Sequence, residues 1–264
     1  MNAVTEIKDK KQLEFHLRKN TPMNIYQIGD LDDFFFNYTK WYGLTEEGEI
    51  RQIAMVYTGT GLPVLLSFCD NNYGCFRELA VQIKDKLPRE FYSHLSCGAE
   101  TFFTDEYNYK SGGKHFKMSL TKKNFRDTAE DKNIRRIGPG DFEKLNELYE
   151  KAYPANWLDR RMLETGKYFG YINGGEIRGA AGIHVYSPLY RVAALGNITT
   201  DPEFRGQSVC RKVTSALCRD LFETVDLIGL NVDTGNAAAI KCYTNCGFEI
   251  CGIYEEFMFR KIPD

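Results

Sequence analysis

The spacing of apolar residues divides the chain into short helices and strands that alternate along its length. Apolar residues at helical spacing predict helices over residues 9–20, 73–86, 139–152, 209–224 and 237–246. Runs rich in β-branched and aromatic residues predict strands over residues 34–42, 49–58, 62–68, 91–97, 134–137, 168–172, 177–186, 192–200, 227–232 and 248–261. Residues 111–120 indicate a turn followed by a further strand. This alternation is typical of an α/β protein with a mixed sheet.

One charged segment divides this pattern into two similar halves. Residues 121–133 (TKKNFRDTAEDKN) are poor in large apolar side chains, as expected of a linker. On each side of it the order is helix, strands, helix, strand, and 264 residues are enough for two domains. We therefore predict a first domain over residues 1–125 and a second over residues 126–264.

Composition narrows the classes of partner. The formal net charge is −2, whereas nucleic-acid-binding proteins usually carry a basic excess, so we expect no nucleic-acid partner. No apolar run approaches the roughly 20 residues that a membrane helix needs, so we expect no membrane association. The first residues, MNAVTEIKDKKQLEF, lack the apolar core of a signal peptide, and we expect a cytoplasmic protein.

The cysteines do not follow a metal-binding or disulfide pattern. None of the eight forms a CxxC pair, and the four histidines are scattered, so we predict no metal site. Most of the cysteines lie among apolar residues, where small buried thiols are expected.

The clearest candidate site is the junction between the strand at 192–200 and the helix that follows it. Asp201–Pro202 ends the strand, and Arg205–Gly206 leads into the helix. The free N–H groups and the positive dipole end of a helix start bind anions such as phosphate. Ser208 and Cys210 stand where such loops usually carry glycine, but small side chains need not block a phosphate if φ stays negative. An ordinary turn without a ligand is the alternative at this point.

A second motif follows, with Asn236, Ala239, Tyr243 and then Gly247–Phe248. With this order of motifs, the chain from about residue 134 to residue 260 resembles the GCN5-related N-acetyltransferase (GNAT) superfamily. The pyrophosphate loop of that superfamily reads Arg/Gln-x-x-Gly-x-Gly/Ala. The chain also resembles tandem-GNAT acetyltransferases and the glycine N-acyltransferase-like group. The first half has only CDNNYGCFREL at its own strand–helix junction, without the arginine or the spacing. The resemblance thus implies two tandem GNAT-like folds, of which the N-terminal one is degenerate.

The resemblance also implies roles for individual residues. Acetyl-CoA or another acyl-CoA would be the co-substrate, and no metal would be needed. Its binding residues would be Ile198, Thr199, Thr200, Arg205, Gly206, Gln207, Ser208, Val209, Cys210 and Asn236. Tyr243 would be the general acid that protonates the leaving thiolate. Asn236 is equally suited to cap its helix, and Tyr243 to a place in the core. His184, Asp233 and a water chain stay open as the general base.

The function implied is direct transfer of an acyl group from acyl-CoA to the amine of a small molecule or amino acid, by a monomer or homodimer. Two alternatives remain. An acyl-CoA sensor without catalytic activity would fit the replaced glycines and the lack of an acid in RVAALGNITT. An aminoacyl-tRNA-dependent transferase also uses paired GNAT folds, but the net charge and the acetyl-CoA motif argue against it.

Overall fold

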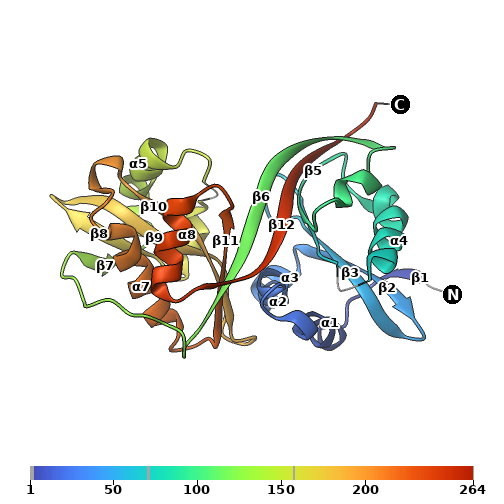
Figure 1. The fold of residues 1–264 in the computed structure, drawn as a ribbon, viewed down its shortest axis with the longest axis horizontal. Coiled ribbons are helices and arrows are strands. Elements are labelled where there is room, and N and C mark those ends of the chain that lie inside the picture. The colour runs from blue at the N-terminus through green and yellow to red at the C-terminus, as the bar shows by residue number, and fades with distance from the viewer. Residues whose placement is uncertain (1–2, 70–71, 157, 264) are drawn as a thin grey trace. The chain divides into compact units, whose positions relative to one another are not determined.

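A computed structural model describes residues 3–69, 72–156 and 158–263 of the chain, which form two compact units (Figure 1). The first unit consists of Met1–Lys117 together with Cys251–Asp264, and the second of Met118–Ile250. This differs from the expected division at residues 125 and 126 in two ways. The first unit ends before the charged segment, and it includes the end of the chain.

The first unit is a sheet with one long helix and several short ones. Its strands lie in the order β1-β2-β3-β4-β5-β12-β6. The strands are β1 (Ala3–Glu6), β2 (Thr39–Glu46), β3 (Glu49–Tyr57), β4 (Val64–Ser67), β5 (Glu90–Leu95), β6 (Tyr107–Thr121) and β12 (Glu249–Lys261). The α-helices are α1 (Lys10–Leu17), α2 (Ile25–Gly29), α3 (Asp33–Phe36) and α4 (Tyr73–Ile83). Strands β6 and β12 both cross the boundary between the units in sequence.

Two expectations for the first unit were wrong. Residues 34–42 were expected to form one strand, but the aromatic residues at its start belong to α3, and β2 begins only at Thr39. The cause is local, because the Asp32 side chain accepts a hydrogen bond from the Phe34 N–H and caps a helical turn. The turn expected at residues 111–113 is also wrong, since β6 continues through Gly112.

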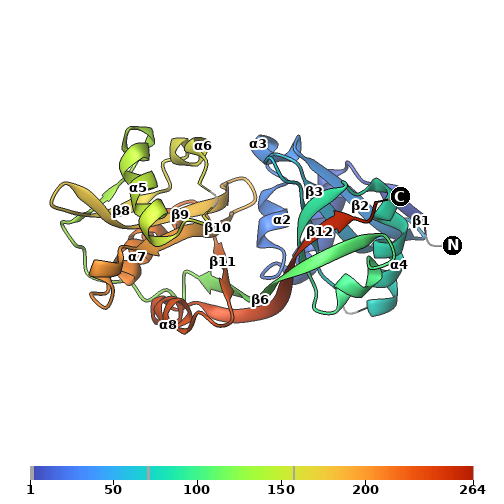
Figure 2. The same ribbon diagram turned by 90° about the horizontal axis from the view of Figure 1, so that it is seen from above.

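The second unit contains the elements of the candidate site. Its strands β7 to β11 lie in the order β11-β10-β9-β8-β7. They are β7 (Ile134–Arg136), β8 (Phe169–Asn173), β9 (Glu176–Ser187), β10 (Val192–Thr200) and β11 (Leu227–Asp233). The helices are α5 (Phe142–Ala152), α6 (Arg160–Glu164), α7 (Val209–Leu221) and α8 (Ala237–Cys246). Figure 2 shows α5 and α6 on one side of the strands and α7 and α8 on the other.

The two units share one order of connections, which confirms the repeat expected from the sequence. Strands β1 to β4 pair antiparallel in sequence order, and β4 pairs parallel with β5 after the crossover helix α4. Strands β7 to β10 likewise pair antiparallel, and β10 pairs parallel with β11 after α7. A parallel pair requires such a crossover, and here it places each helix start directly after a strand end.

The charged segment before β7 lies along α7 rather than hanging free. Asp127 accepts hydrogen bonds from Ser215 at 2.6 Å and from Arg219 at 2.7 Å. Asp131 forms an ion pair with Lys212 at 2.7 Å. The hydrophilic composition of the segment therefore reflects ion pairs with a helix as well as contact with solvent.

No helix within the described ranges has the length and apolar character that crossing a bilayer requires.

Candidate acyl-CoA site

The bulge in strand β10 lies just before the candidate loop. The register with β9 shifts between Gly196 and Thr199, and Asn197 has a φ of 52°. The Tyr149 hydroxyl on α5 donates a hydrogen bond of 2.6 Å to the Asn197 carbonyl and holds the bulge in place. Thr199 is buried and Ile198 is half-buried. The bulge re-aims the end of the strand, as bulges next to active sites commonly do.

Beyond the bulge, β10 and β11 are no longer paired with each other. Their parallel register ends at the Leu195–Leu230 pair, although β10 continues to Thr200 and β11 to Asp233. Each unpaired end carries a buried polar atom without a hydrogen-bond partner among the described residues, namely Thr200 Oγ1 and Asn231 Oδ1. Buried polar atoms of this kind are rare and fit hydrogen bonding to a bound ligand. Asn231 was not among the residues predicted from the sequence.

A buried carboxylate anchors the loop that follows. Asp201 is 1% exposed, and its carboxylate forms ion pairs of 2.9 Å with both Lys151 and Arg178. It also accepts a hydrogen bond from the Glu203 N–H, which begins the short helical turn Pro202–Phe204. Burial alone would raise the pKa of Asp201, but the bonds from Lys151, the Glu203 N–H and Arg178 outweigh it and lower that pKa. The loop therefore leaves β10 from a fixed point.

The start of α7 is open. Its first backbone hydrogen bond runs from the Lys212 N–H to the Ser208 carbonyl at 3.0 Å. The backbone N–H groups of residues 206–211 have no hydrogen-bond partner among the described residues. Ser208 occupies the N-cap, but its side chain does not cap the helix. An anion at this point would meet consecutive free donors together with the positive end of the helix dipole.

The backbone of the loop differs from the sequence-based expectation at one residue. Ser208 has a φ of 61°, so the condition that φ stays negative there is not met. Gly206 has a φ of 77°, with no atom within 4 Å of an added Cβ. Serine thus occupies a left-handed conformation that favours glycine, at a cost of about 1–2 kcal/mol. The loop nevertheless leaves its N–H groups unpaired.

The other predicted loop residues have separate surroundings. Arg205 is exposed, and the Gln207 side chain donates to the Glu203 carbonyl at 3.2 Å. The Val209 side chain is 2% exposed and lies against Gly179 of β9, where an added Cβ would be 2.4 Å from it. Only the backbone of Val209 is therefore available to a ligand.

Asn236 acts as a helix cap in this structure. Its side-chain oxygen accepts a hydrogen bond from the Ala239 N–H at 3.1 Å, and α8 begins at the next residue. The helix ends as expected at Gly247, which has a φ of 100°. The capping function expected of Asn236 is confirmed, and a contact with coenzyme A stays a prediction.

Tyr243 lies on α8 with its ring in the core of the second unit. It is 7% exposed, and its ring packs edge-on against Phe248 at a centroid distance of 6.0 Å. Burial raises the pKa of Tyr243 well above its usual value, and the neighbouring thiols of Cys210 and Cys242 add to this. Its hydroxyl has no hydrogen-bond partner in the part of the chain that the structure describes. Tyr243 is therefore a protonated, unpaired donor at neutral pH.

Cys210 contacts a second thiol, and this contact was not expected from the sequence. Its Sγ accepts a hydrogen bond from Cys242 Sγ on α8 at 3.0 Å. This bond lowers the pKa of the Cys210 thiol and raises that of Cys242. Both residues are half-buried, and Cys242 directly precedes Tyr243.

The two residues considered as general base, His184 and Asp233, both lie within hydrogen-bonding distance of neighbouring groups. His184 Nε2 is 3.4 Å from Asn197 Oδ1, and the imidazole ring lies so close to Gly196 that an added Cβ would clash with it. Asp233 accepts a hydrogen bond of 2.6 Å from the Gly235 N–H. Of the two, His184 lies against the bulged end of β10.

The equivalent helix start in the first unit is closed. The Asn72 side chain caps α4 by accepting a hydrogen bond of 3.1 Å from the Cys75 N–H. Residues 70–71, within the motif CDNNYGCFREL, lie outside the described residues. A capped helix start agrees with the expectation that this half is a degenerate copy.

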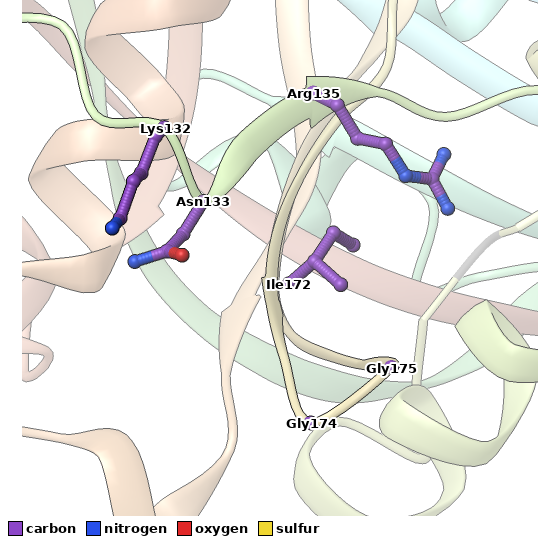
Figure 3. A pocket seen from close by; sticks show the side chains of 6 residues that line it. All are labelled: Lys132, Asn133, Arg135, Ile172, Gly174 and Gly175. Carbon is purple, nitrogen blue, oxygen red and sulfur yellow. The ribbon is translucent and has the colours of Figure 1, made fainter.

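A pocket in the second unit lies away from the predicted residues. Figure 3 shows its lining, which comes from β7 and the two residues before it, from β8 and from the β8–β9 turn: Lys132, Asn133, Arg135, Ile172, Gly174 and Gly175. Arg135 is held by Asp141 at 2.6 Å, and Asn133 donates to the Tyr171 hydroxyl at 3.4 Å. Residues 3–69, 72–156 and 158–263 contain no group of three or more His, Cys, Asp or Glu side chains placed to hold a metal ion.

Comparison with known proteins agrees with this geometry. Residues 134–248 match the model of the acetyltransferase (GNAT) family, a segment that includes the bulged strand, the open helix start and Tyr243. Residues 134–248 are a GNAT-family domain. No curated protein matches the sequence.

Solved structures extend the similarity of the GNAT domain to the whole chain. A Drosophila protein has a TM-score of 0.72 at 10% identity, over 98% of each chain. A GCN5-related N-acetyltransferase from Sphaerobacter thermophilus has a TM-score of 0.62 at 12% identity, over 100% of this chain and 96% of that one. A tandem GNAT protein from the clavulanic acid biosynthesis pathway has a TM-score of 0.58 at 12% identity, over the full length of both. At these identities the similarity establishes the fold, which is the expected mixed α/β tandem arrangement.

Proposed function

We propose that this protein is an acyl-CoA-dependent N-acetyltransferase that transfers an acyl group directly to the amine of a small molecule or amino acid. The observation that carries the proposal is the run of unpaired backbone N–H groups over residues 206–211 at the start of α7. A pyrophosphate carries the charge and the acceptor oxygens that such a run of donors fits. The match of residues 134–248 to the GNAT family supports coenzyme A as the source of that pyrophosphate.

The pantetheine arm of the co-substrate would lie along the unpaired ends of β10 and β11. A backbone N–H near residues 198–200 would donate to the thioester carbonyl and stabilise the negative charge that develops on its oxygen. Thr200 Oγ1 and Asn231 Oδ1, both buried and unpartnered among the described residues, would bond to the amide groups of the arm. The loop would bind the phosphates of the co-substrate through Arg205, Gln207 and Cys210. Of these, Arg205 has an exposed side chain that would face the phosphates.

Tyr243 would donate to the leaving sulfur. Burial keeps its hydroxyl protonated, and no described residue accepts its hydrogen bond. A thiol is a stronger acid than a phenol of raised pKa. The hydroxyl therefore first stabilises the leaving thiolate as a hydrogen-bond donor, and it transfers its proton to the sulfur when the amine loses its own proton. The amine proton would pass to His184, Asp233 or a water chain.

An amine panel with acetyl-CoA, read by release of free thiol, tests this proposal. We expect at least one small primary amine or amino acid to be acetylated, with the product identified by mass spectrometry. Tyr243→Phe should keep acetyl-CoA affinity and lose turnover. If the wild-type protein binds acetyl-CoA but acetylates no member of a broad panel, the result favours an acyl-CoA-binding protein without turnover over an enzyme.

A further inference from the structure

The second unit contains a pair of thiols positioned for oxidation at the candidate site. Cys210 is the second residue of α7 and Cys242 lies within α8, and their sulfur atoms are 3.0 Å apart. A disulfide bond is about 2.05 Å long, so the two sulfurs need to approach by only about 1 Å. We propose that Cys210 and Cys242 form a reversible disulfide that weakens acyl-CoA binding, a regulatory role that rests on the proposed function.

The surroundings favour this pair over the other cysteines. Cys210 and Cys242 are half-buried, whereas Cys218 and Cys246 are buried. The start of a helix stabilises a thiolate, which is the form that reacts with oxidants. Cys246 lies one turn beyond Cys242 on the same helix and also bonds to the Cys242 thiol, but Cys246 is buried and its sulfur is 4.0 Å from the Arg211 carbonyl. Cys210 is thus the reactive thiol and Cys242 the thiol that resolves it.

The chemistry requires a peroxide as oxidant. The Cys210 thiolate attacks one peroxide oxygen, the O–O bond breaks, and a sulfenic acid forms with release of one water after protonation. The Cys242 sulfur then attacks the Cys210 sulfur, the S–O bond breaks, and a second water leaves. In total, two thiols lose two electrons and two protons, and hydrogen peroxide is reduced to two waters.

The bond would disturb the groups that the proposed function uses. The Cys210 N–H is one of the unpaired donors at the start of α7, and Tyr243 follows Cys242 directly. Drawing the first turn of α7 toward α8 moves these donors relative to a bound pyrophosphate. Loss of one hydrogen bond to a charged group weakens binding about tenfold or more. We therefore expect at least this loss of affinity on oxidation.

Tryptic mapping tests the bond independently of any ligand. Reduced full-length protein is treated with hydrogen peroxide, free thiols are blocked, and the protein is digested. Trypsin releases residues 206–211 with Cys210 as the sole cysteine, and residues 242–260 with Cys242 and Cys246 among theirs. We expect these two peptides to be linked in the wild type and in Cys246→Ser, and separate in Cys242→Ser. Absence of the link in the wild type, or its survival in Cys242→Ser, overturns the proposal.

Calorimetric titration with acetyl-CoA tests the consequence for binding. Acetyl-CoA has no free thiol, so it cannot itself form a mixed disulfide with Cys210. We expect oxidised wild type to bind at least about tenfold more weakly than reduced wild type, and phosphine treatment to restore binding. Oxidised Cys242→Ser, which cannot close the disulfide, should lose less affinity than oxidised wild type, whereas Cys97→Ser, which alters an exposed cysteine of the first unit, should behave like wild type.

The outcomes separate this inference from the proposed function. A linked peptide pair with unchanged affinity overturns the regulatory role and leaves the acetyltransferase proposal standing. Failure of the reduced wild type to bind acetyl-CoA refutes the proposed function and the regulatory role with it, while the peptide map still decides whether the disulfide forms.

Discussion

The hydrogen bond that holds the β10 bulge offers a direct test of how the site is built. Tyr149→Phe removes only the hydroxyl that donates to the Asn197 carbonyl at 2.6 Å. Tyr149 is 0% exposed and Asn197 is 4% exposed, so water cannot readily replace the lost donor. A buried acceptor left unpaired costs about 1–3 kcal/mol. We therefore expect the variant to be destabilised by about 2 kcal/mol, which lowers Tm by about 4–8 °C in a domain of this size.

The same change should weaken acetyl-CoA binding. Asn197 holds a left-handed conformation that its neighbours must enforce, and relaxation of the bulge would redirect residues 198–200. Stability is measured by denaturant unfolding followed by circular dichroism, and affinity by calorimetry. Tyr109→Phe is the control, because Tyr109 is 45% exposed and its hydroxyl bonds to no described residue. A loss of stability no larger than that of the control would refute the assigned role of the Tyr149 hydroxyl.

Four further variants test the loop, the general acid and the carboxylate that anchors the loop. Ser208→Gly removes the strain of a left-handed serine, about 1–2 kcal/mol, but costs about 0.4–1 kcal/mol of backbone entropy. Stability should therefore rise slightly, and acetyl-CoA affinity should not fall. Ser208→Ala is the control and should resemble wild type, so equal effects of the two substitutions would contradict this interpretation. Tyr243→Phe should lower kcat by about 10²–10⁴ with an unchanged Kd, and an unchanged kcat would exclude it as the acid. The pKa of Asp201 is lowered in the fold, so its contribution to stability is complete above about pH 4 and is lost as pH falls through the lowered value. Asp201→Asn should therefore be less stable than wild type at pH 7, and its free energy of unfolding should fall less steeply as the pH is lowered. A free energy of unfolding that changes with pH from 2 to 7 as it does in wild type would contradict this.

Local chemistry explains why much of the second unit could be predicted. Asn236 caps α8 and Gly247 ends it, and both signals lie within one or two residues of the boundaries that they set. The repeat of strand and helix order followed from periodicity alone. In the first unit the aromatic run at 34–42 was misread because its side chains suit strands, although Asp32 carried the capping signal for α3.

The features that could not be predicted depend on long-range contacts or on backbone conformation. The inclusion of residues 251–264 in the first unit depends on the pairing of β12 with β5, which no local pattern reveals. Ser208 has a positive φ, and serine does not ordinarily signal a left-handed residue. The contact between Cys210 and Cys242 and the unpaired oxygen of Asn231 both arise from packing between elements.

Titration of acetyl-CoA into the reduced wild-type protein tests the central claim most directly. Gly206→Glu places a carboxylate beside the free N–H groups, and Gly206→Gln imposes the same backbone strain at φ 77° without the charge. The account predicts saturable one-to-one binding by wild type, weaker binding by the glutamine variant and the weakest by the glutamate variant. Absence of binding to folded, reduced wild type would contradict the account, because the open start of α7 would then not be a coenzyme A site.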